Sequence, residues 1–345
     1  MDVLITGITG RVGANVAAAL LARGWAVRGL VMPGDTQAAK LKMLEGVRVF
    51  EGSLRDQEAI NTAMAGATHV IHLAAQLIRG NTPVDAFYDI NAFGTLRLLE
   101  AFVKQGGKGG RFVLASTDGT YCPGAPPSVP LAEDAPQLPA DYYGTSKLLG
   151  EHILFNHAKQ YDVPYSIVRF ATVVSPEEAP KIFRFNWMRT LLQQEFLERN
   201  SHLWPLFAEH KGMAKRLEEE VGDRAANNPA VSLAGPDGEP WSLHLADVRD
   251  VVQGVLLALD HPAALGEAFN IAGPDTTTLR EGARVASELL GLPSIEVRLP
   301  LRWQLDMDIS KAKRLLGYAP KWSYEQVMRN LETAEAIPAL LANPQ

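Results

Sequence analysis

Short apolar segments alternate with amphipathic stretches through the first half of the chain. The apolar segments are VLIT, AVRGLV, VRVF, HVIHLA, RFVLAS and YSIVRF, and stretches such as RVGANVAAALLARG and NAFGTLRLLEAFVKQ lie between them. This spacing predicts a parallel sheet with helices on both faces. Nearly continuous apolar segments are typical of strands that are covered on both sides. The pattern therefore predicts an α/β fold with a doubly wound parallel sheet.

A glycine-rich turn follows the first of these strands. VLITGITGRVG places Gly7, Gly10 and Gly13 between the strand and a helix that is expected to end near Gly24. Glycine is needed where the backbone turns sharply, where it approaches a pyrophosphate and where the helix packs on the strand. The helix N-terminus also offers free N–H groups to phosphates. A turn without a ligand is the alternative, but the ordered strands around it favour a Rossmann-type dinucleotide site.

The strand–helix alternation ends near Pro176. From Lys181 to Asn228 the sequence is helical and aromatic, and further helices are expected near 248–259 and 279–290. A chain of 345 residues exceeds one typical core. We expect a dinucleotide-binding domain over 1–175, to which 240–262 returns. We expect a smaller, mostly helical substrate-binding cap over 176–239 and 263–345.

Composition excludes several classes of function. The net charge is −6 and no Lys/Arg cluster is present, which argues against binding to nucleic acid. A single cysteine, Cys122, excludes an internal disulfide and indicates a reducing compartment. There is no apolar run of membrane-spanning length, and strand-like residues begin at Val3. We therefore expect a cytoplasmic protein that acts on a small molecule, with neither a nucleic acid nor a membrane as partner.

Several motifs in order resemble one superfamily over nearly the whole chain. Besides the glycine turn they are HVIHLAA, NAFGTLRLLEA, YGTSK, HLADVRDVVQGVLLAL, EAFNIAG and DISKAKRLLGYAPKW. Together they resemble the extended short-chain dehydrogenase/reductase superfamily, the NAD-dependent epimerase/dehydratase family. The resemblance implies an NAD(P)-dependent enzyme and a homodimer formed through the helices that carry Asn91 and Tyr143. The cofactor contacts that it implies are Gly7, Thr9, Gly10, Arg11, Val12, Gly13, Met32, Ser53, Leu54, Leu73, Ala74, Ala75, Asn91, Ala115, Tyr143, Lys147 and Phe170.

The adenosine end departs from the family pattern. The acidic residue that would hold the ribose should end the second strand, where Val31 and Met32 stand. An Asp there accepts from the 2′-hydroxyl and repels a 2′-phosphate, whereas an Arg favours the phosphate. Ser53 replaces the Asp that is usual near the adenine, and Arg11 is either a phosphate ligand or a solvated helix-start residue. On balance the sequence favours NAD over NADP.

A tyrosine and a lysine four residues apart are the expected catalytic pair. Tyr143 and Lys147 would face the same way on a helix. A tyrosine with a pKa of ~10 needs a depression of roughly three units, or ~4 kcal/mol, to act as a base near neutrality. A nearby ammonium and an oxidised nicotinamide both favour the phenolate. The resemblance gives Lys147 a second role on the nicotinamide ribose. It also assigns the substrate-oxygen contact to Thr117, with Ser116 as a supporting or cofactor contact. A chance pair on an exposed helix face is the alternative.

Most of the sequence features that indicate a nucleotide-sugar substrate are absent. Nucleotide-sugar enzymes of this branch commonly carry an Asn where Thr172 stands and an Arg where Pro240 stands. Lys181, Arg184 or Arg189 are possible replacements for that Arg. STDGTY resembles the Ser-Thr-Asp-Glu-x-Tyr motif of 4,6-dehydratases, but the Glu is replaced by a glycine, and elimination needs that carboxylate. We therefore regard Asp118, Thr172 and Arg184 as candidate substrate contacts.

Two groups of side chains have a structural alternative to a role in the site. His69 and His72 point to opposite faces of a strand, and the other histidines are scattered, so no metal site is expected. The aromatic residues of the cap region either build its core or a subunit contact, which we favour, or line the pocket: Phe183, Phe185, Trp187, Trp204 and Phe207.

Three functions remain open. The first is an NAD(P)-dependent oxidoreductase that transfers a hydride to or from a secondary alcohol or sugar hydroxyl, with Tyr143 as the acid–base group. The second is a sugar epimerase that retains its cofactor. The third is a dinucleotide sensor without turnover, against which the intact Tyr143, Lys147 and Thr117 argue.

Overall fold

A seven-stranded parallel sheet forms the centre of the protein. The computed structural model describes residues 1–78, 82–121, 126, 128–194, 207 and 209–340. The strand order is β11-β6-β5-β4-β1-β2-β3, and every neighbouring pair is parallel. The strands are β1 (Asp2–Thr6), β2 (Ala26–Val31), β3 (Arg48–Glu51), β4 (His69–His72), β5 (Phe112–Thr117), β6 (Tyr165–Phe170) and β11 (Glu267–Ile271). The expected doubly wound, Rossmann-type sheet is confirmed.

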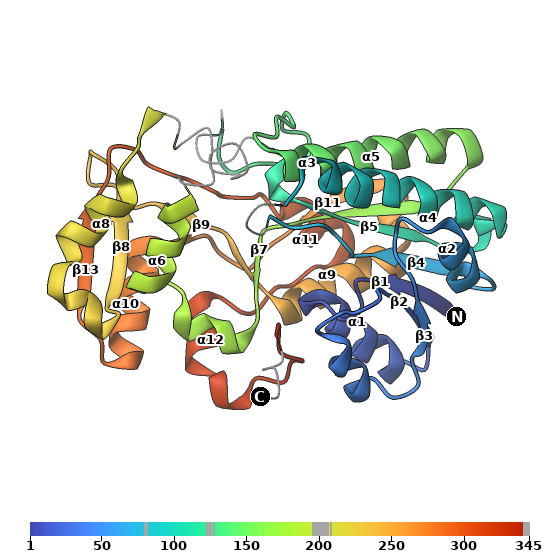
Figure 1. Cartoon of the computed structure of the whole chain (residues 1–345), viewed down its shortest axis with the longest axis horizontal. Helices are drawn as coiled ribbons and strands as arrows, with labels where there is room; N and C mark the ends of the chain where they lie inside the picture. Colours follow the sequence, from blue (N-terminus) through green and yellow to red (C-terminus); the bar gives the residue numbers. More distant parts are fainter. Residues whose placement is uncertain (79–81, 122–125, 127, 195–206, 208, 341–345) are drawn as a thin grey trace.

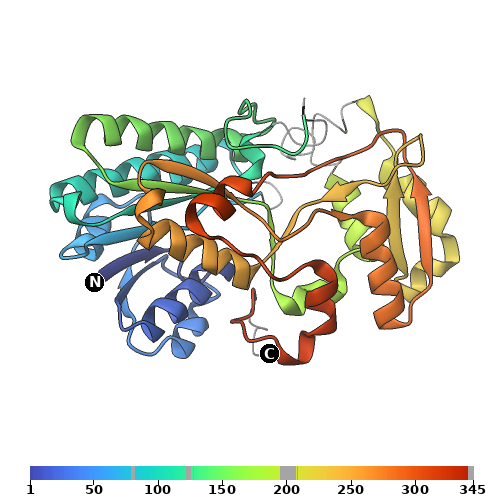
Figure 2. The ribbon, with the colours of Figure 1, turned by 180° about the vertical axis from the view of Figure 1, so that it is seen from behind.

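Helices cover both faces of this sheet (Figures 1 and 2). One face carries α2 (Gln57–Met64), α4 (Phe93–Lys104) and α5 (Tyr142–Tyr161), and the other carries α1 (Arg11–Ala22), α9 (Val248–Asp260) and α11 (Ser310–Leu316). Alternate side chains of each strand contribute to the hydrophobic cores on the two faces of the sheet. Leu4 and Val70 belong to the core beneath α2, α4 and α5, whereas Val3, Ile5 and Ile71 belong to the opposite core. Successive side chains of a strand point to opposite faces, so continuous apolar strands build two cores.

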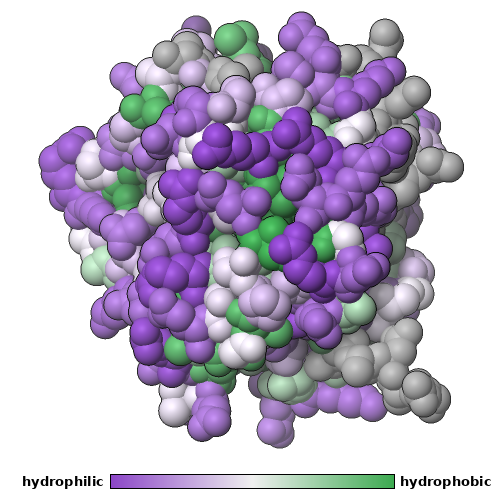
Figure 3. Space-filling model, turned by 90° about the vertical axis from the view of Figure 1, so that its left-hand side faces the viewer, coloured by the Kyte–Doolittle hydropathy of each residue, from purple (hydrophilic) through white to green (hydrophobic). Residues whose placement is uncertain are grey.

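A second, smaller layer of structure lies at one end of the sheet. Its parallel strands β8 (Ala230–Ala234) and β13 (Ser294–Arg298) pack with α6 (Phe185–Leu192), α8 (Met213–Val221), α10 (Leu279–Leu290) and α12 (Tyr324–Arg329). This cap has its own hydrophobic core. The outer surface at that end of the molecule is mostly hydrophilic, with small apolar spots (Figure 3).

Shorter elements complete the chain. They are η1 (Ala38–Met43), α3 (Val84–Phe87), η2 (Tyr88–Ala92), η3 (Gly107–Gly109), η4 (Asp118–Thr120), β7 (Thr172–Val174), η5 (Pro176–Lys181), η7 (Gly222–Asn227), β9 (Ser242–Leu243), β10 (Leu245–Asp247), η8 (Pro262–Ala264), β12 (Thr277–Thr278) and η9 (Leu331–Thr333). Within the described ranges, none of the helices combines the length and the apolar character needed to cross a membrane.

The observed packing differs from the expected domain boundaries in two respects. Strand β11, in the range 263–345 that was assigned to the cap, pairs with β6 at the edge of the central sheet. The helix α11 packs beside it in the same core. In addition, the cap expected to be mostly helical contains the pair β8 and β13. The strand EAFNI contains the polar residues Glu267 and Asn270 and lies outside the strand–helix alternation of the first half, so only its pairing with β6 reveals its place.

The aromatic residues of the cap region build its core. Phe183, Phe185 and Phe207 are buried in the hydrophobic cluster of the cap, and Trp187 packs against that cluster. These four side chains therefore have the structural role that we favoured over lining the pocket. Trp204 lies outside the described residues, as does Cys122.

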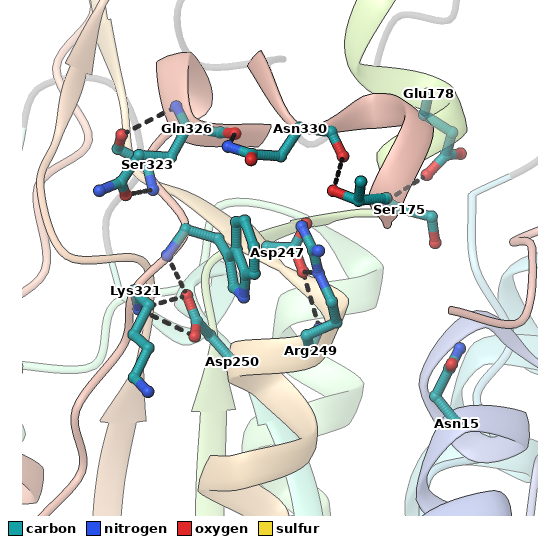
Figure 4. Close-up of polar contacts among 12 residues, drawn as sticks. Asn15, Ser175, Glu178, Asp247, Arg249, Asp250, Lys321, Ser323, Gln326 and Asn330 are labelled. Atoms are coloured by element: carbon teal, nitrogen blue, oxygen red, sulfur yellow. Dashed lines mark hydrogen bonds and ion pairs between the residues drawn. The ribbon is translucent and has the colours of Figure 1, made fainter. Parts of the chain in front are cut away.

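A polar joint connects the sheet to the segment that precedes α12 (Figure 4). Asp247 accepts a hydrogen bond from the Arg249 amide at the start of α9 and pairs with its guanidinium at 2.7 Å. That guanidinium lies over the Trp322 ring, 3.5 Å from its centroid. Asp250 accepts hydrogen bonds from the amides of Lys321 and Trp322, between 2.9 and 3.0 Å. These contacts fasten the cap to the end of the sheet that carries the site.

Candidate active site

The expected site residues gather at the carboxyl ends of the central strands. Gly7 follows β1, Leu73 follows β4, Thr117 ends β5 and Phe170 ends β6. The pairing of β5 with β6 places Thr117 opposite Phe170. In the strand order, β1 lies between β2 and β4, and the chain therefore changes direction across the sheet at β1 and β4. Ligands of doubly wound folds bind at such a switch point.

The glycine turn has no room for side chains. Gly7 has a φ of +71°, and a Cβ there would lie 2.7 Å from the Ala74 amide nitrogen. A Cβ on Gly13 would lie 2.1 Å from the Gly7 carbonyl oxygen. The turn is closed by a 2.9 Å hydrogen bond from the Gly10 amide to that oxygen. Gly7 and Gly13 are therefore required by the local backbone geometry, while a Cβ on Gly10 would lie 3.1 Å from the Gly7 carbonyl oxygen.

A hydrogen-bond chain through a buried histidine fixes the adjacent loop. The Ala74 amide donates a hydrogen bond to the Thr6 hydroxyl. The Thr6 hydroxyl oxygen lies 2.7 Å from His72 Nδ1, to which it is hydrogen-bonded. His72 Nε2 lies 3.1 Å from the Thr95 hydroxyl, which donates to the Asn91 carbonyl. Burial lowers the pKa of His72 to about 3, so it is neutral. This chain holds β4 beside the glycine turn and explains the histidine that the sequence left without a role.

Asn91 is held by the protein on several sides. Its side-chain oxygen accepts from the Gln76 amide at 2.7 Å, and its amide group donates to the Gln76 carbonyl and to the Ser146 hydroxyl at 2.8 Å. These bonds tie the loop after β4 to α5. Asn91 therefore positions the loop, while its expected contact with the cofactor stays a prediction.

The three expected catalytic side chains come together at the start of α5. Asp141 precedes this helix and accepts a 2.6 Å hydrogen bond from the Gly144 amide, as an N-terminal cap should. Tyr143 and Lys147 follow one turn apart, and the Lys147 residue is only 3% exposed. The Thr117 hydroxyl shares a hydrogen bond with Tyr143. Strand β5 and helix α5, distant in sequence, thus bring Tyr143 and the Thr117 hydroxyl into contact.

The protein's own groups hold the tyrosine in its protonated form. Burial raises the pKa of Tyr143 well above its ordinary value, and the carboxyls of Asp118 and Asp141 raise it further. The hydrogen bond from Thr117 opposes this only in part. Burial also lowers the pKa of Lys147 to about 8, against the opposing effect of Glu151. Burial and two carboxyls therefore disfavour the phenolate, and the expected depression of the tyrosine pKa by Lys147 and an oxidised nicotinamide stays a prediction for the protein with its cofactor.

A family model described as the NAD dependent epimerase/dehydratase family matches residues 3–272. The chain belongs to this family. Its members are enzymes, and the expected use of NAD is confirmed by this membership. The resemblance to the extended short-chain dehydrogenase/reductase superfamily is confirmed as well.

Relatives of this family member align along nearly the whole chain. A UDP-glucose 4-epimerase of Halalkalibacterium halodurans is 25% identical over 95% of this chain and 93% of its own length. A UDP-glucuronate 4-epimerase 2 of Arabidopsis thaliana is 33% identical over 93% of this chain and 72% of its own length. A short-chain dehydrogenase/reductase superfamily protein of Agrobacterium tumefaciens, crystallised with bound NAD, is 28% identical, covers 97% of both chains and superposes with a TM-score of 0.81.

The site of this epimerase/dehydratase-family protein fits a dinucleotide. The glycine turn forms a cradle that any Cβ at Gly7 or Gly13 would fill. Next to it, Arg11 Nε is buried and has no hydrogen-bond partner, and the Ser116 hydroxyl at the end of β5 is in the same state. Such groups are normally paired, which points to a polar ligand. Met32 is 61% exposed at the end of β2, where an adenine ring can cover it.

The candidate substrate residues separate into two groups. Asp118 lies in the site, where its carboxylate accepts a 2.8 Å hydrogen bond from Thr117. Thr172 begins β7, directly after β6, and its amide donates to the His244 carbonyl. Arg184 is used elsewhere, because its guanidinium donates to the carbonyls of Asn228 and Pro180 and braces the cap. The structure therefore gives Arg184 a structural role in the cap.

Two features of the site were not expected from the sequence. Asp141 is buried with one carboxylate oxygen unpartnered, and burial raises its pKa to about 6. Its signal was present as an N-cap residue directly before YYGTSK. The second feature is a buried ion pair beneath the helix, in which Arg169 of β6 binds Glu151 of α5 through two hydrogen bonds, of 2.7 and 3.1 Å. Among the described residues, no three His, Cys, Asp or Glu side chains are placed to hold a metal ion.

Proposed function

We propose that this protein oxidises or reduces a secondary hydroxyl carbon of a sugar or alcohol, with Tyr143 as the acid–base group. The observation that carries the proposal is the interaction between Tyr143 and Thr117, one helical turn from the buried Lys147 and at the same edge of the sheet as the glycine turn. A phenol and a hydroxyl that face the same point can both contact one substrate oxygen.

The roles of the side chains follow from their charges. The glycine turn would hold NAD⁺, which would supply the hydride acceptor for the carbinol carbon and a positive charge that favours the phenolate. Tyr143 then takes the hydroxyl proton from the substrate, and in the reverse direction it returns that proton. Thr117 hydrogen-bonds the same oxygen. Lys147 remains protonated below its pKa of about 8 and favours the phenolate.

Our first candidate substrate is a sugar or alcohol that carries no nucleotide. Thr172 and Pro240 stand where nucleotide-sugar enzymes commonly carry Asn and Arg. The guanidinium of Arg184 already donates to two carbonyls of the cap. A diphosphate is normally held by paired arginine donors, and these positions do not supply them.

The second candidate is a nucleotide-sugar epimerase that retains its cofactor. The relatives named UDP-glucose 4-epimerase and UDP-glucuronate 4-epimerase favour it. Arg189 also favours it, since its Nε is buried without a partner while the guanidinium lies over the Phe185 ring. An arginine in this state is able to bind a phosphate.

Cofactor release separates the two candidates. The protein as purified is assayed for bound dinucleotide, and then for NADH formation with free sugars, simple secondary alcohols and UDP-sugars. Net NADH formation with a substrate that lacks a nucleotide supports the first candidate. Interconversion of UDP-sugars without added NAD would overturn it and support the second.

We also propose that two copies associate through α4 and α5 in the cytoplasm. The outer faces of these helices expose Phe93, Leu149 and Phe155, and apolar side chains on adjacent helices suit a second copy of the same face. Phe155→Asp should convert the dimer to a monomer in sedimentation equilibrium. Met43→Asp is the matched control, because Met43 is exposed at the end of η1, where Leu41 and Leu44 pack into the core on the opposite face of the sheet. A wild-type monomer at micromolar concentration contradicts the proposal.

A further inference from the structure

The adenosine end of the site contains a carboxylate that is not where the sequence pattern requires it. The acidic position at the end of β2 holds Val31 and Met32, although NAD-specific sites normally have an acid there. Asp35 follows in the next loop and turns back towards the glycine turn. Its Oδ2 accepts a 2.5 Å hydrogen bond from the Thr9 hydroxyl, and its Oδ1 accepts a 2.8 Å bond from the Gln37 amide.

These two bonds place the carboxylate in the region of the adenosine ribose. Thr9 belongs to the glycine turn at the end of β1, and β1 pairs directly with β2. In dinucleotide sites the ribose lies between the glycine turn and the end of the second strand. Asp35 is fixed between the same two segments, four residues beyond the end of β2.

The cations that approach this region are already engaged. The Arg11 guanidinium pairs with Glu178 at 2.6 Å, and the other oxygen of that carboxylate accepts from the Ser175 amide at 2.9 Å (Figure 4). Lys40 is fully buried and donates to the Ala339 carbonyl at 2.6 Å. Arg11 Nε still lacks a partner, but Glu178 compensates the charge of the guanidinium and Lys40 is buried, so neither offers an uncompensated cation to a 2′-phosphate.

The local balance of charge is negative. Three carboxylates act on Lys40, those of Asp35, Glu177 and Glu178, while Arg11 is the cation that acts on it. Glu177 accepts from the Ala339 amide at 2.7 Å, so it is fixed in the cluster. Three carboxylates against two cations leave a surplus of negative charge. A ribose diol donates hydrogen bonds to such a cluster, whereas a 2′-phosphate is repelled by it.

We propose that Asp35 selects NAD over NADP by accepting the adenosine ribose hydroxyls, and that Glu178 supports this selection by neutralising Arg11. This selection acts when the dinucleotide binds to the protein, so it does not depend on the reaction that we propose. Asp35 is thus a displaced equivalent of the acid that is missing at Met32.

The competing explanation is that Asp35 only stabilises its own loop through Gln37. Asp35→Asn separates the two, because an asparagine retains an oxygen for the Gln37 amide and removes the charge. Glu178→Gln likewise retains the contact with the Ser175 amide. Asp237→Asn is the matched control, because Asp237 caps a turn of the cap through the Glu239 amide.

The test is a titration of dinucleotide-free protein with NAD⁺ and NADP⁺ by calorimetry. We expect wild type to bind NAD⁺ at least 100-fold more tightly than NADP⁺. Asp35→Asn should narrow that ratio about tenfold, and the double variant with Glu178→Gln should narrow it further. Asp237→Asn should leave the ratio unchanged. An unchanged ratio in a folded Asp35→Asn protein overturns the proposal.

A measurement on wild type keeps the proposal testable if the variants do not fold. Repulsion of the 2′-phosphate is screened by salt, since the Debye length falls from about 10 Å at 0.1 M to about 3 Å at 1 M. The ratio of the two dissociation constants should therefore narrow several-fold between 0.05 and 0.5 M KCl. A ratio that is independent of salt contradicts a selection by charge.

Discussion

The Thr117 hydroxyl donates its one hydrogen to Asp118, at 2.8 Å, while it also contacts the Tyr143 phenol. A hydroxyl that donates to a carboxylate has only its lone pairs left for a second partner. The same hydrogen therefore cannot also reach the Tyr143 phenolate while Asp118 accepts it, although a hydrogen bond from Thr117 is what lowers the pKa of Tyr143. Burial raises the pKa of Asp118 to about 6, so this arrangement holds at neutral pH.

Asp118→Asn should move the pH profile of alcohol oxidation to lower pH. The carboxylate raises the pKa of Tyr143 by repelling the phenolate, and the variant removes that repulsion. The limb of the kcat/KM profile that rises as Tyr143 ionises should shift down by about one pH unit. Below pH 6, where Asp118 is protonated, wild type and variant should converge. A more than 100-fold loss of kcat at every pH, with KM unchanged, would instead identify Asp118 as a proton-transfer group.

Tyr143→Phe should abolish the reaction without weakening cofactor binding. Phenylalanine retains the ring against its neighbours and removes the group that exchanges a proton with the substrate. A loss of about 10³-fold in kcat is typical of removing a general acid–base group. NAD⁺ binding should change less than threefold, as measured by calorimetry. Tyr142→Phe, on the neighbouring residue of α5, is the matched control. Retained turnover in Tyr143→Phe would falsify the catalytic assignment.

Asp141→Asn should stabilise the protein at neutral pH but not in acid. Burial raises the pKa of Asp141 from 3.8 to about 6 in the folded state. The favourable contribution of this group is therefore complete below pH 3.8 and is lost as the pH rises through 6. Asparagine imitates the neutral carboxyl and retains the cap. Urea unfolding should show a gain of about 1 to 2 kcal/mol at pH 7.5. A gain of equal size at pH 4 is the contrary result.

Glu151→Gln should destabilise the fold strongly. The Arg169 and Glu151 side chains are 4% and 0% exposed, and the arginine also donates to the Tyr121 hydroxyl. Removing one partner of a buried pair leaves the other charge uncompensated, at a cost of about 3 to 5 kcal/mol. Replacing both by apolar residues, Glu151→Leu with Arg169→Met, should cost less than the single change. Urea unfolding of wild type, Glu151→Gln, Glu151→Leu, Arg169→Met and the double variant measures this, and additive effects of the two apolar changes would contradict the coupling.

The local elements were predictable because short-range patterns specify them. The six strands of the first half appear where apolar segments predicted them, and α10 spans Leu279–Leu290 as expected. The glycines of the first turn are fixed by backbone sterics, and Tyr143 and Lys147 share a face because a helix repeats every 3.6 residues. Strand β11 was missed because its partly polar sequence lies outside the strand–helix alternation of the first half and acquires its place only through pairing with β6.

The sequence by itself determined the sheet, the glycine turn and the identities of the catalytic candidates. Only the tertiary structure decided how they act. The contact between Thr117 and Tyr143 joins a strand to a distant helix, and burial among carboxyls raises the pKa of the tyrosine. The loop of Asp35 folds back onto Thr9, 26 positions earlier in the chain. Burial and charge are sums over long-range neighbours, which no local pattern specifies.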